Sequence, residues 1–205
     1  MAGDCAITME AGRLKAARPK RTDLERQREA GVVRAAQRGS HQAMEELFRR
    51  HWRGAHRAAY LVVHDRSAAE DIAQEAFISA IRSLDRFDRK RPFAPWLHRI
   101  VVNRAIDWTR AKKARREVSG EAIESWEGES PEPDLDAIAD SGRLVEVLRS
   151  LGPEQRAVVV MRYILEYTPG EIAEILGMPR GTVNSRLRRG LDALASALPK
   201  ESGDD

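Results

Sequence analysis

The side chains whose types and spacing most clearly indicate a function lie toward the C-terminal end, in a segment with helix-turn-helix spacing. In residues 171–187 (EIAEILGMPRGTVNSRL), Ala173 is small where one helix would cross another, and Gly177 falls where a turn requires positive φ. Val183 and Leu187 would then face inward. The outer surface of the second helix would carry Arg180, Thr182, Asn184, Ser185, Arg186 and Arg189.

These outer residues suit contact with duplex DNA in the major groove. An arginine can donate two hydrogen bonds to the edge of a guanine, and hydroxyl groups can bind phosphates or bases. The pattern therefore predicts a DNA-reading helix, with Arg180 and Arg186 as the residues that set its specificity. A helical hairpin with a solvated polar face is the competing interpretation.

A second group of cationic residues lies in the middle of the chain. Residues 86–116 contain eleven Lys and Arg and two acidic residues, whereas residues 117–140 contain nine Asp and Glu and no Lys or Arg. The net charge of +3 hides this division. Two basic segments on either side of an acidic spacer suggest contact with a polyanion at two separate places. For either segment alone, a solvated charged face is the competing interpretation.

The elements that position these side chains are predicted to be helices, because the apolar residues recur at helical spacing and do not alternate as in a strand. Leu47, His51 and Ala55 belong to one such stripe. Ser67 is expected to open one helix and Thr168 another, each with a glutamate three residues later. The predicted fold class is all-α, with two small helical domains joined by a flexible acidic linker.

Composition divides the chain into five segments. Residues 1–24 are expected to form a flexible basic tail, and residues 25–116 the first helical domain. The acidic linker would occupy residues 117–140, where Gly, Ser, Pro and acidic residues leave little to bury. Residues 141–198 would form the second domain and residues 199–205 a C-terminal tail.

Several function classes find no support in the sequence. The five histidines form no metal-ligand set, and no Gly-rich phosphate loop or nucleophile motif is present, so neither an enzyme nor a cofactor or metal site is expected. The single cysteine, Cys5, cannot form a disulfide within the chain. No apolar run approaches the ~20 residues that span a bilayer, and no signal peptide is recognised, which favours a cytoplasmic protein without membrane insertion.

Several segments together resemble a known family. Residues 69–77 (AEDIAQEAF), 84–88 (LDRFD) and 93–107 (FAPWLHRIVVNRAID) resemble region 2 of the bacterial sigma-70 family, and residues 148–191 resemble its region 4. Two such domains, without regions 1.1 and 3, are typical of the extracytoplasmic-function group. The resemblance spans most of the chain and implies a non-enzymatic subunit that directs RNA polymerase to particular promoters.

The resemblance also implies three contact surfaces. Asp71, Gln74 and Glu75 would dock on the clamp helices of the polymerase β′ subunit, and the outer helix-turn-helix residues would read the minus-35 element. Asn103 matches the edge of a loop that captures a flipped base. The residues implied at the minus-10 element are Arg99, Asn103, Arg104, Asp107, Trp108 and Arg110. Trp108 is a candidate stacking platform, whereas the apolar spacing around Trp96 favours core packing.

The implied partners are core RNA polymerase, through the β′ clamp helices and the β flap, and promoter DNA. An anti-sigma protein wedged between the two domains is a further expected partner, with a monomer when free or a 1:1 complex with that protein. The alternative is a helix-turn-helix transcriptional regulator that binds duplex DNA independently of polymerase. It would leave the basic segment at residues 93–116 without a function. A regulator binds duplex DNA alone, whereas a sigma factor binds poorly until it joins core polymerase.

Overall fold

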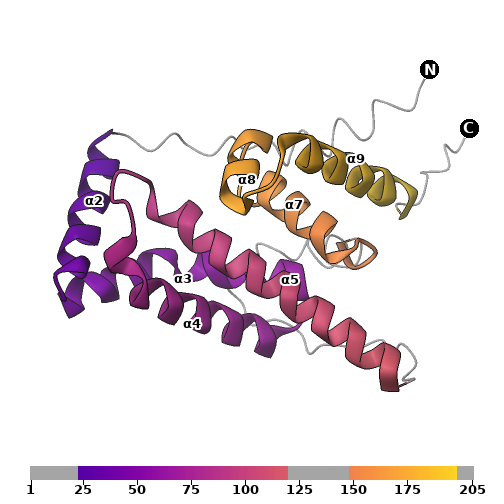
Figure 1. The fold of residues 1–205 in the computed structure, drawn as a ribbon, viewed down its shortest axis with the longest axis horizontal. Coiled ribbons are helices and arrows are strands. Elements are labelled where there is room, and N and C mark those ends of the chain that lie inside the picture. Colours follow the sequence, from indigo (N-terminus) through magenta and orange to yellow (C-terminus); the bar gives the residue numbers. More distant parts are fainter. Residues whose placement is uncertain (1–22, 120–147, 198–205) are drawn as a thin grey trace, which may run out of the picture.

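The computed structural model describes residues 23–119 and 148–197, which form helices and the turns between them (Figure 1). The first unit comprises helices α2 (Asp23–Gln37), α3 (His41–Val63), α4 (Arg66–Arg82), the short 3-10 helix η1 (Leu84–Arg86) and α5 (Phe93–Ser119). The second comprises α7 (Pro153–Tyr163), α8 (Pro169–Leu176) and α9 (Arg180–Ala197). These residues contain no strand, so the all-α prediction with two small helical domains is confirmed.

The expected tails and linker fall largely outside the described residues. Helix α2 begins at Asp23, within the segment assigned to the basic tail, and α5 continues to Ser119, within the segment assigned to the linker. The rest of residues 1–24 and 117–140, and the tail at 199–205, lie outside the described part of the chain. Among the described helices, none has the length and apolar character needed to cross a membrane.

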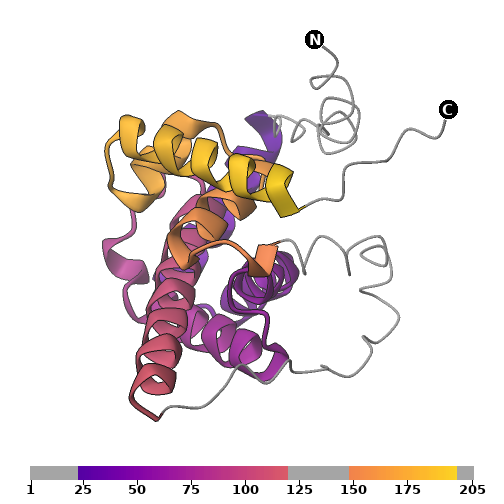
Figure 2. The same ribbon diagram turned by 90° about the vertical axis from the view of Figure 1, so that its right-hand side faces the viewer.

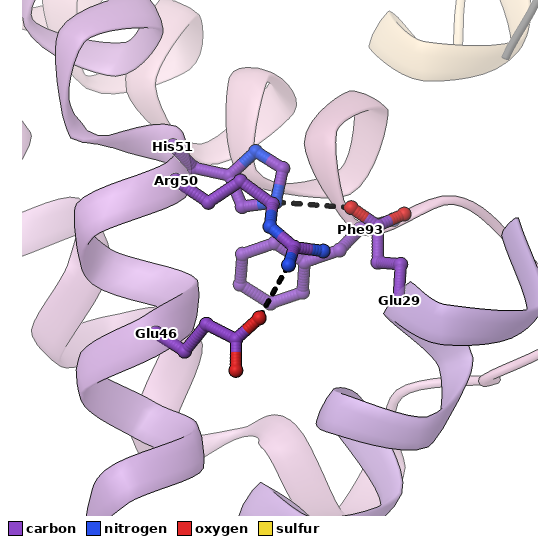
Figure 3. A network of polar contacts seen from close by, with 5 residues as sticks. All are labelled: Glu29, Glu46, Arg50, His51 and Phe93. Atoms are coloured by element: carbon purple, nitrogen blue, oxygen red, sulfur yellow. Dashed lines mark hydrogen bonds and ion pairs between the residues drawn. The ribbon is translucent and has the colours of Figure 1, made fainter. Parts of the chain in front are cut away.

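Helix α3 lies at the centre of the first unit, where α2, α4 and α5 all pack against it. Leu47 and Ala55, from the expected stripe, are buried, and His51 is buried beside them. Burial of the imidazole is compatible with a stable core because its Nε2 atom lies 3.0 Å from Oε1 of Glu29 on α2 (Figure 3). The histidine therefore completes the apolar stripe with a polar contact between two helices.

The start of helix α4 differs from the sequence prediction. Asp65, and not Ser67, caps the helix: its Oδ1 atom accepts a hydrogen bond from the backbone N–H of Ala68 at 3.1 Å. The difference arises because α3 ends at His64 in the left-handed conformation, with φ of 52°. The chain then reverses within one residue, and Asp65 is already extended as a cap requires.

The second unit has the expected helix-turn-helix geometry. Thr168 and Glu171 form the predicted reciprocal cap: the Glu171 carboxylate accepts from the Thr168 backbone N–H at 2.7 Å, and the Thr168 hydroxyl accepts from the Glu171 N–H at 3.3 Å. Gly177 ends α8 with φ of 64°. Val183 and Leu187 are buried on the inner face of α9. These four local predictions are confirmed.

The two units pack directly on each other, with α7 against α3 and α5 and with α8 against α5 (Figures 1 and 2). Arg156 on α7 is 7 % exposed, and its Nη1 atom donates to the carbonyl of Val62 on α3 at 2.6 Å. The ring of His98 on α5 lies against Tyr167, with Nδ1 2.8 Å from the phenol oxygen. Both contacts are buried, so polar groups as well as apolar packing set the relative placement of the units.

His64 gives this arrangement a predicted pH dependence. Both ring nitrogens are buried without a hydrogen-bond partner, and burial followed by the charges of Arg156 and Arg149 lowers the pKa of His64 to about 3. The unfolded chain should protonate this group near its ordinary pKa of 6.5. Between these two values the unfolded state binds more protons, so stability falls as pH is lowered from 7 toward 3.

Replacing His64 with Asn should remove this contribution while retaining a residue that tolerates positive φ. We expect the wild-type chain to lose roughly 1–2 kcal/mol of unfolding free energy between pH 7 and pH 5 because of this group. His64→Asn should lose correspondingly less, as measured by urea unfolding at the two pH values. The same change at exposed His41 serves as the control and should keep the wild-type pH dependence.

Gly190 lies where α9 packs tightly against α7. A Cβ atom at Gly190 would lie 2.9 Å from Cγ2 of Val159, a stiff β-branched side chain that cannot easily move away. Gly190→Ala should therefore destabilise the chain by roughly 1–3 kcal/mol in urea unfolding. Gly181, on the same helix, has open space around its Cα, so Gly181→Ala should be neutral or stabilise by up to about 1 kcal/mol. Equal effects of the two changes would contradict the crossing geometry.

Candidate nucleic-acid interface

A pocket of about 420 Å³ lies between the end of α4, the short helix η1 and one face of α5. Its α5 residues recur three and four positions apart, so they project from the same side of the helix. The pocket is lined by Ser79, Ser83, Arg86, Phe87, Trp96, Arg99, Ile100, Asn103, Arg104 and Asp107.

The pocket brings together four of the six residues expected at the minus-10 element, namely Arg99, Asn103, Arg104 and Asp107. Trp96, which the sequence favoured as a core residue, is half-buried. It packs against Phe87, with ring centroids 4.6 Å apart, and also lines the pocket. The core interpretation was therefore incomplete.

The lining has the chemistry needed to hold an unstacked base. The rings of Phe87 and Trp96 supply an aromatic wall, and an amide and a carboxylate at Asn103 and Asp107 can hydrogen-bond to a base edge. Arginine guanidinium groups at the same opening can bind the phosphates of a single strand. The hydroxyl of Ser83 is already engaged, since it donates to the backbone carbonyl of Ser79 at 2.6 Å.

The other two expected minus-10 residues lie outside the pocket. Trp108 is half-buried, and the ammonium group of Lys112 lies 4.5 Å from its ring centroid. Arg110 donates from Nε to Oε1 of Glu154 on α7 at 2.7 Å. Burial acts to raise the pKa of Glu154, but the hydrogen bond from Arg110 and other local interactions outweigh it and lower the pKa. Arg110 is therefore engaged by the second unit.

The three residues expected to contact polymerase are exposed on helix α4. Asp71, Gln74 and Glu75 lie three and four positions apart and thus share one face. Gln74 donates to Glu70 at 3.2 Å, and Glu75 forms an ion pair with Arg104. This pair joins an expected polymerase contact to an expected DNA contact.

The six expected minus-35 residues all lie on α9. Arg180, Asn184 and Arg189 are exposed, whereas Thr182, Ser185 and Arg186 are half-buried. The Ser185 hydroxyl donates to the carbonyl of Thr182 at 3.1 Å and accepts from Arg189 at 3.4 Å. Arg186 contacts the sulfur of Met178 at 3.6 Å, which places its guanidinium beside the turn of the helix-turn-helix.

Sequence reasoning missed part of both surfaces. Arg86 and Phe87 belong to the LDRFD segment, which was assigned to a family region but given no site role. On α4, the side chain of Ile78 is 49 % exposed and continues the face of Gln74 and Glu75. Helical spacing at i+3 and i+4 could have identified Ile78, whereas the fold of η1 against α5 could not be read from spacing.

Family models match both units. The model for sigma-70 region 2 matches residues 47–115, and a model for sigma-70 region 4 matches residues 141–194. Among curated relatives, the ECF RNA polymerase sigma factor SigW of Bacillus subtilis is 34% identical over 81% of this chain and 94% of its own. The ECF RNA polymerase sigma factor SigM of Mycobacterium tuberculosis is 35% identical over 83% of this chain and 84% of its own.

Solved structures show the same architecture. CnrH, in complex with the cytosolic domain of CnrY, is similar with a TM-score of 0.62 and 26% identity, over 82% of this chain and 95% of that one. The sigma factor RpoE of Bartonella quintana, in complex with the anti-sigma factor NepR, is similar with a TM-score of 0.57 and 22% identity. That match covers 74% of this chain and 94% of the other and supports the fold.

Proposed function

We propose that this chain uses three of its surfaces in promoter-directed transcription initiation. The chain belongs to the extracytoplasmic-function group of the sigma-70 family of RNA polymerase sigma factors. The pocket on α5 captures an unpaired base of the minus-10 element, α9 reads the minus-35 element, and α4 docks on core polymerase. A helix-turn-helix regulator is not favoured, because it would leave the basic segment at residues 93–116 without a function. The sigma-70 region 2 match, at residues 47–115, covers nearly all of this segment.

The observation that carries this proposal is the composition of the pocket. Extracting a base from a duplex costs a few kcal/mol, which contacts to the separated strand must offset. An aromatic wall, hydrogen-bonding groups and arginines at one opening supply those contacts without a chemical step. We accordingly propose that the chain catalyses no reaction itself and acts in the cytoplasm, where core polymerase and promoter DNA are found.

The contacts between the units support weak DNA binding by the free chain. Arg110 is paired with Glu154 on α7, and a Cβ atom at Gly177 would lie 3.6 Å from Nη2 of Arg99. Two expected minus-10 residues therefore face the second unit, and access to them would improve if the units moved apart. We infer that the chain binds promoter DNA strongly only with core polymerase.

An anti-sigma protein is a further proposed partner. CnrH was solved with a second protein, the cytosolic domain of CnrY, and the more distant RpoE with the anti-sigma factor NepR. A protein that binds both units of this chain would compete for the surfaces that polymerase and DNA need. We propose a monomer when the chain is free and a 1:1 complex with such a partner.

Replacing Asp71, Gln74 and Glu75 together with Ala should abolish stable co-elution with core RNA polymerase on a sizing column. The reason is that the docking face of α4 loses its acidic and amide groups, which would pair with cationic groups of the partner. A matched triple change at exposed Gln42, Glu45 and Asp192 removes the same kinds of group elsewhere and should leave co-elution intact.

Co-elution that survives the α4 change would leave the sigma function in place and refute these contact residues. No complex with core polymerase, together with tight duplex binding by the chain alone, would instead favour the regulator.

Arg186→Ala should relax the sequence preference of the holoenzyme at one position of the minus-35 element, at a cost of roughly 1–3 kcal/mol for the preferred base. Binding to a set of single-base duplex variants at fixed salt measures this preference. Arg188→Ala removes the same charge from an exposed position of α9 and is the control. It should weaken binding to all variants about equally. A uniform loss from both changes would assign Arg186 to phosphate contact only.

A further inference from the structure

Helix α2 contributes no residue to the pocket lining, yet it holds both ends of the segment that forms one wall. The region 2 match begins at residue 47, beyond the end of α2 at Gln37. The wall itself consists of η1 and the residues around it, which connect α4 to α5. The connection has backbone hydrogen bonds of its own, such as those from Arg86 to Ser83 and from Phe87 to Leu84, which shape its turns but do not attach it to the neighbouring helices.

Gln37 binds this connection at two points. Its side-chain Nε2 donates to the carbonyl of Leu84 at 3.0 Å and to the carbonyl of Phe87 at 3.0 Å. An amide group has two N–H donors, so Gln37 uses both on one turn. The carbonyls lie on either side of Arg86, and both Arg86 and Phe87 line the pocket. The position of this wall is therefore tied to the last residue of α2.

Glu29 binds the other end of the connection. It is 3 % exposed, and its Oε2 accepts from the backbone N–H of Phe93, the first residue of α5, at 3.5 Å. Its other oxygen lies 3.0 Å from Nε2 of His51, a contact drawn as a dashed line in Figure 3. A carboxylate at a helix N-terminus also interacts favourably with the helix dipole. The ring of Phe93 packs against Phe87 and Trp96, with centroids 5.9 and 5.6 Å apart, behind the pocket's aromatic wall.

We propose that α2 sets the shape of the base-binding pocket from outside, with Gln37 as the positioning residue for the η1 wall and Glu29 as the positioning residue for the start of α5. This inference rests on the proposed function, in which the pocket holds an unpaired base. Without the Gln37 donors, two backbone carbonyls lose a partner, and the wall that presents Arg86 and Phe87 relaxes. The affinity for DNA that carries the preferred base then exceeds the affinity for DNA that lacks it by a smaller factor.

The test uses the holoenzyme reconstituted from core polymerase and the full chain. Fork DNA with a single-stranded minus-10 segment is first selected by wild-type holoenzyme from a randomised library. The position with the strongest preference is then replaced by an abasic site, and affinities for the two forks are compared. Their ratio reports base capture, whereas a general loss of stability or of polymerase binding changes both affinities together.

Gln37→Glu keeps the shape of the side chain but removes both N–H donors. We expect it to lower the affinity ratio by about tenfold, comparable to the loss of two neutral hydrogen bonds, with affinity for the abasic fork unchanged. Gln42→Glu makes the identical change at an exposed position of α3 and should leave the ratio at its wild-type value. If Gln37→Glu does not fold, Gln37→Met fills a similar volume without charge or donors, and the same loss is expected.

A wild-type ratio in the folded Gln37 variant would overturn the positioning role, as would an equal fall in Gln42→Glu. A fall in affinity for both forks, with the ratio preserved, would overturn it as well and assign Gln37 to stability alone. If wild-type holoenzyme itself showed no difference between the two forks, the pocket would not be a base site. The proposed function would then fail, and this inference with it.

Discussion

The buried guanidinium of Arg156 joins the second unit to the first. Burial, with a smaller effect from Arg149, lowers the pKa of Arg156 to about 10, so the group stays charged at neutral pH. A buried charge is compatible with a stable fold only when its donors find partners. Three carbonyls of the second unit, at Leu148, Arg149 and Leu151, accept from it, and the fourth belongs to Val62 of α3. The hydrogen bond from Arg156 to Val62 therefore adds a polar contact to the apolar packing between the two units.

Helix α5 connects this constraint to the site, because its different faces contact different parts of the molecule. One face packs into the core with Leu97 and Val101, which are fully buried. A second presents Asn103 to the pocket, and His98 and Arg110, from different positions around the helix, contact the second unit. A change in the contact between units therefore acts on the helix that carries most of the pocket. This arrangement gives a physical route by which a partner that separates the units would also alter access to the residues that we propose bind DNA.

Helical periodicity and capping residues predicted most of the fold, because these features depend on neighbours within a few positions. Gly177, Thr168 and the stripe through Leu47 are of this kind. The cap at Asp65 was missed because its position depends on where the preceding helix ends. That helix ends before His64, which adopts a left-handed conformation that the local sequence does not predict. Trp96 was read as core since its spacing is apolar, and its second role follows only from the packing of η1 against α5. The contacts between the units join residues far apart in the sequence, such as His98 with Tyr167, which are 69 positions apart, and Arg156 with Val62, which are 94 apart, and no local pattern predicts them.

We propose that this chain opens promoter DNA as part of a holoenzyme by holding an unpaired base. Permanganate mapping of unpaired thymines on a promoter fragment tests it most directly, with the chain alone, core polymerase alone and the two combined. We expect reactive thymines in the minus-10 element only when both are present, and their loss when the pocket residue Asn103 is changed to Ala. Protection of duplex DNA by the chain alone, with no reactive thymines in the combined sample, would contradict it.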